Sequence, residues 1–181
     1  MMLEVAEKIR DDGFKPDIII GLARGGLVPA RVFSDLLEQS NLATTRTECY
    51  VGISKSKSNP VLSEQLSARV EGQSVLLVDD IADTGRSLEL AKKHIMESGA
   101  REIRIVTLFK KPWSTLKPDY SAAETSRWVV FPWDMKETVR SAFENRGNMT
   151  NADLSEKLKS AGLPKTLVHR FLKEITGEKT C

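Results

Sequence analysis

The fold is decided by residues 75–87, where an apolar segment runs into two acids and then into a turn of small and hydroxyl-bearing residues. The segment reads Val75-Leu76-Leu77-Val78-Asp79-Asp80-Ile81-Ala82-Asp83-Thr84-Gly85-Arg86-Ser87. Its four leading apolar residues predict a short buried strand, and the residues from about 85 to 98 predict a helix. Ligands of open α/β sheets bind at the carboxyl ends of the strands. The sequence therefore predicts a ligand site beside Asp79 and Asp80.

The turn after the two acids has the composition of a phosphate-binding loop. Backbone N–H groups at the start of a helix have no partner within it, and the helix dipole is positive there. The hydroxyls of Thr84 and Ser87 add donors, and Gly85 lets the backbone approach a ligand closely. The preceding acids would repel a bare phosphate, so we interpret them as residues that bind sugar hydroxyls and a divalent cation. The alternative is structural: Asp83 or Thr84 caps the helix, and the acid pair is a solvated strand end.

The rest of the first 134 residues alternates between expected strands and expected helices. Strands are expected at residues 17–21, 44–53, 102–109 and 128–131, helices at residues 3–10 and 27–38, and a loop at residues 54–62. Since strands that alternate with helices form right-handed parallel crossovers, this order predicts an α/β fold. We expect a twisted, mostly parallel sheet with helices on both faces.

The chain changes character after Asp134, where three short helices are expected at residues 135–144, 151–159 and 164–175. The expected organisation is a domain at residues 1–134 followed by a small helical extension at residues 135–181. Within it, residues 151–175 have the proportions of a helix-turn-helix, which would point to nucleic acid. The other interpretation, packing against its own domain or a second copy of the chain, is favoured because the basic excess is small.

Composition excludes several classes of protein. Lys and Arg number 27 against 25 Asp and Glu, so the net charge of +2 does not favour nucleic acid as a partner. No apolar run approaches the roughly 18 residues of a membrane span, and residues 1–14 are too charged for a signal peptide. The two cysteines and two histidines offer too few ligands of the right spacing for a structural zinc site. We expect a cytoplasmic protein with reduced thiols and no membrane partner.

Four segments occur in the order found in one enzyme family. Besides residues 75–87 they are Ala23-Arg24-Gly25-Gly26-Leu27-Val28-Pro29, Leu108-Phe109-Lys110-Lys111-Pro112 and Trp128-Val129-Val130-Phe131-Pro132-Trp133-Asp134-Met135. With these segments the chain resembles the type I phosphoribosyltransferases, and most of all the enzymes that act on the 6-oxopurines guanine, xanthine and hypoxanthine. The resemblance implies their fold and a role in purine salvage. The implied reaction transfers phosphoribosyl from phosphoribosyl pyrophosphate (PRPP) to N9 of the purine and releases pyrophosphate.

The resemblance implies a role for each matched residue. Pyrophosphate would be bound by Arg24, Gly25 and Gly26, the ribose hydroxyls and Mg²⁺ by Asp79 and Asp80, the 5′-phosphate by Ala82, Asp83, Thr84, Gly85, Arg86 and Ser87, and the purine by Lys111, Trp128 and Val129. Asp83 is implied to be the catalytic acid–base residue beside purine N7. The peptide bond before Arg24 can be cis in this family, and we expect it to be cis here. The family also implies a homodimer.

Several alternatives stay open on the sequence. Lys110 is an alternative to Lys111 as the purine contact, and the two lysines also fit a solvated surface pair. Arg24 also fits a surface arginine in a glycine-rich turn, and Trp128 an ordinary half-buried strand aromatic. Residues 54–62 have the composition of a lid that closes over the site. The alternative function is a regulator that senses PRPP and uses the C-terminal helices on nucleic acid, and the preferred purine is left open.

Overall fold

The computed structural model describes residues 1–49 and 60–177, and the chain divides into two compact units, Met1–Arg127 and Trp128–Cys181. The division falls at Arg127, whereas the sequence placed the boundary at residue 134. The expected lid lies mostly outside the described residues, as does the end of the strand expected at residues 44–53.

The first unit is built on a six-stranded sheet with the strand order β3-β2-β1-β4-β5-β6. Its elements are α1 (Met2–Asp11), β1 (Ile18–Ala23), α2 (Leu27–Leu36), β2 (Leu42–Cys49), β3 (Pro60–Glu64), β4 (Ser74–Ala82), α3 (Arg86–Glu97), β5 (Glu102–Lys110) and β6 (Tyr120–Glu124). Strands β2, β1, β4, β5 and β6 are parallel to one another, and the edge strand β3 is antiparallel to β2. The predicted α/β fold with a mostly parallel sheet is confirmed.

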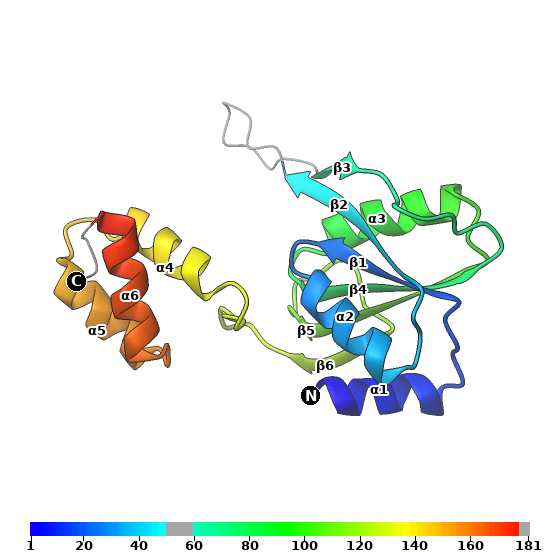
Figure 1. Ribbon diagram of the computed structural model, residues 1–181, viewed down its shortest axis with the longest axis horizontal. Coiled ribbons are helices and arrows are strands. Elements are labelled where there is room, and N and C mark those ends of the chain that lie inside the picture. Colours follow the sequence, from blue (N-terminus) through cyan, green and yellow to red (C-terminus); the bar gives the residue numbers. More distant parts are fainter. Residues whose placement is uncertain (50–59, 178–181) are drawn as a thin grey trace. The chain divides into compact units, whose positions relative to one another are not determined.

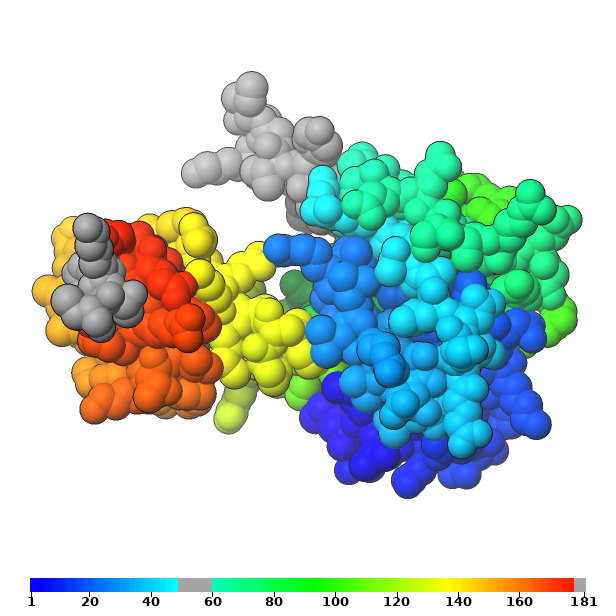
Figure 2. Space-filling view, in the orientation of Figure 1, coloured from blue at the N-terminus to red at the C-terminus, as the bar shows by residue number. Residues whose placement is uncertain are grey.

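The two central strands are apolar because helices cover both faces of the sheet (Figure 1). Ile18 and Ile20 of β1 and Leu77 of β4 pack with α3 in one hydrophobic cluster. The alternate residues point to the other face, where α2 contacts β1 and β4 and also packs against α1. Figure 2 shows α1 and α2, both blue, next to one another on the surface of this unit. In the register of β1 and β4, Gly21 lies opposite Val78, so the carboxyl ends of both strands meet at one edge.

Strand β4 is longer than the sequence predicted. It continues past Val78 to Ala82, because β5 supplies pairing partners as far as Lys110. Asp79 and Asp80 therefore lie inside a strand of the sheet, and the interpretation of the pair as a solvated strand end is wrong. Both residues are partly buried.

Two other expected segments differ. The strand expected at residues 128–131 is wrong: these residues form no strand, and the last strand is β6, parallel to β5. Tyr120 explains its position, because its ring is buried and its hydroxyl donates to Asp12 Oδ2 at 2.6 Å, which joins β6 to the end of α1. Part of the loop expected at residues 54–62 is also wrong, since Pro60 begins β3.

The second unit contains the three expected helices, α4 (Met135–Glu144), α5 (Asn151–Ser160) and α6 (Lys165–Thr176). They enclose a small core of aliphatic residues, comprising Val139, Leu154, Leu158, Leu163, Val168 and Leu172. A capping box begins α5, since Thr150 Oγ1 accepts from the N–H of Asp153 and Asp153 accepts in turn from the N–H of Thr150. The ion pair between Lys136 and Glu174 joins α4 to α6. The unit thus has a hydrophobic core of its own.

Among the residues that the structure describes, no helix combines the length and the apolar character required to span a membrane.

Candidate active site

The two acids of β4 lie at the carboxyl edge of the sheet and influence each other directly. The N–H of Asp80 donates to Asp79 Oδ1 at 2.9 Å. Burial and, to a smaller extent, the charge of Asp80 raise the pKa of Asp79 well above its ordinary value, although the hydrogen bond from the Asp80 N–H lowers it. The ionised form of Asp79 is therefore costly in the protein without ligands. A cation or sugar hydroxyls at this position would stabilise that form.

The turn after β1 approaches the acid pair so closely that it requires glycine. A Cβ atom at Gly25 would lie 2.5 Å from Asp80 Oδ1, and one at Gly26 would lie 2.1 Å from the carbonyl oxygen of Val78. The turn begins with a cis peptide bond between Ala23 and Arg24, which confirms that expectation. The expected pyrophosphate loop and the expected ribose acids are thus neighbours in space.

The turn after β4 leads into α3 without a side-chain cap. The N-cap residue is Gly85, in a left-handed conformation with φ of +84°, and no side chain accepts a capping hydrogen bond there. Thr84 Oγ1 lies 3.5 Å from the backbone nitrogen of Arg86, at the limit of a hydrogen bond. The interpretation of Asp83 or Thr84 as a simple helix cap is therefore wrong. The first N–H groups of a helix have no intrahelical partner, so this turn suits an anion.

Residues 111–116, which we call the strap, lie across the turn after β4. The N–H of Lys111 donates to the carbonyl of Ala82 at 2.9 Å, and the N–H of Thr115 donates to the carbonyl of Thr84 at 3.1 Å. The Thr115 hydroxyl adds a second donation to the carbonyl of Thr84 at 2.8 Å. A Cβ atom at Gly85 would lie 2.7 Å from the backbone nitrogen of Leu116, so strap and turn are in close contact.

The strap brings an indole to the expected acid–base residue. Trp113 Nε1 donates to Asp83 Oδ1 at 2.9 Å, and the Lys111 ammonium lies 5.4 Å from the centroid of the Trp113 ring. Asp83 is exposed and Trp113 is 54% exposed, whereas Lys111 is buried. Three groups able to contact a polar aromatic ligand, a carboxylate, an indole and an ammonium, therefore lie side by side.

The structure separates the two neighbouring lysines. Lys111 Nζ donates to the carbonyl oxygen of Arg127. Lys110 Nζ forms an ion pair with Glu124 Oε2 at 3.4 Å, on the edge strand β6. Lys111 is buried beside Trp113 and Lys110 pairs with β6, which argues against a solvated pair. The purine role of Lys111 stays a prediction.

Trp128 and Val129 begin the second unit. Trp128 is 82% exposed and lies in no strand, so the interpretation as a half-buried strand aromatic is wrong. Arg24, at the other end of the expected site, is also exposed. The purine role of Trp128 and Val129 and the pyrophosphate role of Arg24 stay predictions.

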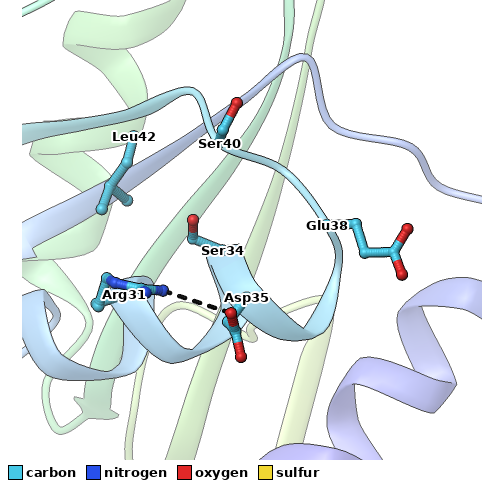
Figure 3. A pocket seen from close by; sticks show the side chains of 6 residues that line it. All are labelled: Arg31, Ser34, Asp35, Glu38, Ser40 and Leu42. Atoms are coloured by element: carbon cyan, nitrogen blue, oxygen red, sulfur yellow. Dashed lines mark ion pairs between the residues drawn. The ribbon is translucent and has the colours of Figure 1, made fainter.

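A pocket elsewhere in the first unit is not part of this site. Figure 3 shows its lining, which consists of Arg31, Ser34, Asp35, Glu38, Ser40 and Leu42. Leu42 is opposite Ile19, near the amino end of β1, so the pocket lies at the sheet edge away from the acid pair. The Arg31–Asp35 ion pair in it has an N–O distance of 4.0 Å and connects two exposed side chains of α2.

The donor set at the acid pair fits a magnesium ion shared with a substrate. Among residues 1–49 and 60–177, no group of three or more His, Cys, Asp or Glu is arranged to hold a metal. Mg²⁺ commonly takes only one or two carboxylates from the protein and its other ligands from water and substrate phosphates. Asp79 and Asp80 supply that number of carboxylates.

The structure is an α/β protein in which an acid pair and two helix-initiating turns meet at the carboxyl edge of a mostly parallel sheet. The chain belongs to the phosphoribosyltransferase family, because the model of the phosphoribosyl transferase domain matches residues 3–139. This range contains the first unit from residue 3 onward.

The similar proteins include several that are named for purine substrates. A xanthine-guanine phosphoribosyltransferase of Cereibacter sphaeroides is 30% identical over 70% of this chain and 77% of its own. A xanthine-guanine phosphoribosyltransferase of Nitratidesulfovibrio vulgaris is 32% identical over 64% of this chain and 68% of its own. The crystal structure of a purine phosphoribosyltransferase from Pyrococcus horikoshii is 39% identical, with a TM-score of 0.67, over 73% of this chain and 86% of that one.

Sequence reasoning overlooked Trp113. It stands two positions after Lys111, inside a segment whose resemblance to the family ended at Pro112. Its partner Asp83 is 30 positions earlier in the chain, so no local spacing connects the two residues. The parallel pairing of β4 with β5 could have suggested the contact, since the ends of paired strands place the segments that follow them together.

Proposed function

We propose that this enzyme transfers the phosphoribosyl group of PRPP to N9 of a 6-oxopurine, guanine, xanthine or hypoxanthine, and releases pyrophosphate. The observation that carries the proposal is the meeting of three groups at one sheet edge: the acid pair of β4, the turn that begins α3, and the glycine turn after β1. Gly25 lies against Asp80, which joins the first and the third. The purine enzymes among the relatives support the choice of substrate.

Each of the three groups binds a different part of PRPP. The turn of residues 82–87 offers backbone N–H groups and hydroxyls to the 5′-phosphate. Asp79 and Asp80 hold the 2′- and 3′-hydroxyls of the ribose and would hold Mg²⁺. Arg24, with Gly25 and Gly26, faces the pyrophosphate, because a guanidinium is a fixed fork of donors that matches phosphate oxygens. When bound, Mg²⁺ neutralises part of the charge that develops on the departing pyrophosphate.

The reaction is a displacement at C1′ of the ribose. The bond from C1′ to the pyrophosphate oxygen breaks, and its electron pair leaves with pyrophosphate while N9 of the purine forms a new bond to C1′. Positive charge grows on the sugar ring and negative charge on the leaving oxygen, and Arg24 stabilises the latter. The purine loses a proton as N9 bonds to C1′, and the carboxylate of Asp83 accepts it as a general base.

In this proposal the base is held by Lys111, Trp128 and Val129. Lys111 contacts the exocyclic oxygen of the purine, and its position beside Asp83 and Trp113 supports that role. Trp128 stacks on the base and Val129 lines the same part of the site. We further propose that the enzyme acts in purine salvage in the cytoplasm as a homodimer. The relatives reported above are named as enzymes, so they do not support the alternative of a regulator that binds nucleic acid.

A panel of bases tests the proposed function. The purified chain is incubated with PRPP, Mg²⁺ and one of guanine, xanthine, hypoxanthine, adenine or uracil, and nucleotide formation and pyrophosphate release are measured. We expect both products with at least one 6-oxopurine and neither with uracil. Turnover of adenine alone would overturn the substrate class, and no product from any base would overturn the transferase.

The variant Trp128→Ala tests the purine site. Base–aromatic stacking is worth about 1–3 kcal/mol, so we expect the affinity for the base to fall by roughly 5- to 150-fold while the affinity for PRPP is kept. Trp128→Phe is the matched control, because it retains an aromatic face and should recover most of the affinity. Unchanged base affinity in Trp128→Ala would remove Trp128 from the purine site.

A further inference from the structure

The expected acid–base residue, Asp83, lies in a turn and not in a strand or a helix. Its side chain is exposed, so packing alone does not fix its orientation. A carboxylate that transfers a proton must present one oxygen to its substrate in a defined direction. The contact that orients it in this structure comes from the strap, through Trp113.

Trp113 holds one of the two oxygens of Asp83. The Nε1–H donates to Oδ1 at 2.9 Å, which is a good length for a hydrogen bond between an N–H and a carboxylate. An indole is a donor only, so it cannot exchange a proton with the carboxylate in ordinary acid–base chemistry. With Oδ1 engaged, Oδ2 is the oxygen that can serve the substrate.

The position of the indole is fixed by the backbone of the strap and by the side chain of Lys111. The strap backbone is tied to the turn through the bonds to the carbonyls of Ala82 and Thr84, on both sides of Asp83. The ammonium of Lys111 lies over the Trp113 ring at 5.4 Å, at a distance where a cation is attracted to the aromatic face. Lys111 is buried and also donates to the carbonyl of Arg127. The donor therefore has a defined position relative to the acceptor.

We propose that Trp113 is a positioning residue for the transfer reaction: its indole N–H fixes Oδ1 of Asp83 and so orients Oδ2 toward the purine. This inference rests on the proposed function, because it needs Asp83 to act on the substrate. It adds to that function a residue outside the segments that resemble the family.

The test is a double-mutant cycle between Trp113→Phe and Asp83→Asn, measured as kcat and as KM for base and PRPP. Phenylalanine keeps an aromatic ring for Lys111 and removes the N–H together with one ring of the indole. We expect Trp113→Phe to lower kcat about tenfold, the scale of one hydrogen bond to a charged group, with both KM values nearly unchanged. In the Asp83→Asn background the same substitution should lower kcat less than about twofold, because a residue acting through Asp83 loses its effect when Asp83 is altered.

Thr115→Val separates positioning from loosening of the strap. This variant removes the hydroxyl donation to Thr84 and leaves the Trp113 contact in place. We expect it to lower the melting temperature without reproducing the fall in kcat. If Thr115→Val lowers kcat as Trp113→Phe does, or if the Trp113→Phe effect is equally large in the Asp83→Asn background, the inference is wrong.

A spectroscopic measurement gives a readout that does not depend on activity. The indole ¹H–¹⁵N signal of Trp113, assigned through its loss in Trp113→Phe, should move upfield in Asp83→Asn, because a neutral amide is a weaker acceptor than a carboxylate. The indole signals of the two other tryptophans should stay in place. An unmoved Trp113 signal would overturn the contact. If instead Asp83→Asn leaves kcat intact, the role of Asp83 in the proposed function fails, which is a different result.

Discussion

The two turns at the carboxyl edge of the sheet both join a strand to a helix, yet they depend on glycine for different reasons. In the turn after β1, Gly26 has an ordinary right-handed backbone, and a side chain is excluded because Val78 and Leu22 leave no space for one. In the turn after β4, Gly85 is required first by its left-handed backbone, with φ of +84°, and then by contact with Leu116.

The difference shows how each turn serves the site. The first turn packs closely against β4 and brings Gly25 next to the carboxylate of Asp80. It therefore places its backbone beside the acid pair. The second turn is held by the strap and carries Asp83 outward to the indole of Trp113. One turn thus places its backbone close to the acid pair, and the other presents Asp83, the side chain that we propose as the acid–base residue. Substitutions in the two turns should therefore fail in different ways.

The largest expected effect is on chemistry in the second turn. Asp83→Asn removes the proposed general acid–base group, so kcat should fall by about 10²- to 10⁴-fold while the affinity for PRPP changes little. Arg24→Gln in the first turn is the contrasting variant and should mainly raise the KM for PRPP. Steady-state kinetics with both substrates checks the pair. An equal loss of kcat and of binding in Asp83→Asn would remove the distinction between the turns.

Gly26→Ala in the first turn should have the largest effect on stability. The new Cβ would meet backbone atoms of Val78 and Leu22 at 2.1 Å and 2.8 Å, and these atoms belong to the central strands of the sheet. Overpacking of this kind costs roughly 1–3 kcal/mol and sometimes more, and we expect a loss of at least about 3 kcal/mol in the free energy of unfolding. Denaturant titration measures this loss. Gly147→Ala, where the new Cβ meets no atom within 4 Å and only the left-handed backbone (φ of +60°) opposes it, should cost about 1–2 kcal/mol.

Gly85→Ala in the second turn should cost less. A left-handed backbone costs a residue with a Cβ about 1–2 kcal/mol, and the strap can move by a small distance to relieve the contact with Leu116. The strap carries Trp113, so we expect kcat to fall together with stability. Parallel measurements of unfolding and of kcat check this prediction. A variant as unstable as Gly26→Ala would show that the strap is as rigid as the strands.

The smallest expected effect concerns the acid pair that the first turn approaches. The pKa of Asp79 is raised, so its ionisation opposes folding, and the stability of the free protein falls as the pH rises from the unfolded pKa through the higher folded one. Asp79→Asn removes this cost. Without PRPP and divalent cations, we expect it to raise the melting temperature near neutral pH by about 2–4 °C, the shift for a gain of roughly 1 kcal/mol.

Asp153→Asn in the second unit is the matched control with the opposite sign. The Thr150 hydroxyl and N–H lower the pKa of Asp153, so its ionised form favours folding. This stability is present above the unfolded pKa and is lost as the pH falls through the lower folded pKa. Asp153→Asn should therefore lower the melting temperature near neutral pH. If Asp79→Asn also lowers the melting temperature, ionisation of Asp79 does not oppose folding and the prediction is wrong.

Much of the fold followed from local patterns in the chain. Consecutive isoleucines at residues 18–20 and the apolar start of residues 75–87 predicted the two central strands, because a strand buried on both faces must be apolar throughout. The helical spacing in residues 27–38 and 135–175 predicted α2 and the helices of the second unit. Edge elements were harder, since β3 and β6 are short, partly exposed and lack an apolar run.

The sequence by itself determined the alternation of strands and helices, the acids and glycines at the strand ends, and the family, because these depend on residues close together along the chain. Only the tertiary structure decided the length of β4, the contact of Gly25 with Asp80, the separation of Lys111 from Lys110, and the hydrogen bond from Trp113 to Asp83. Each of these depends on which strand lies beside which. Pairing between strands brings residues that are far apart in the sequence into contact. The local pattern of residues does not reveal which segments will pair.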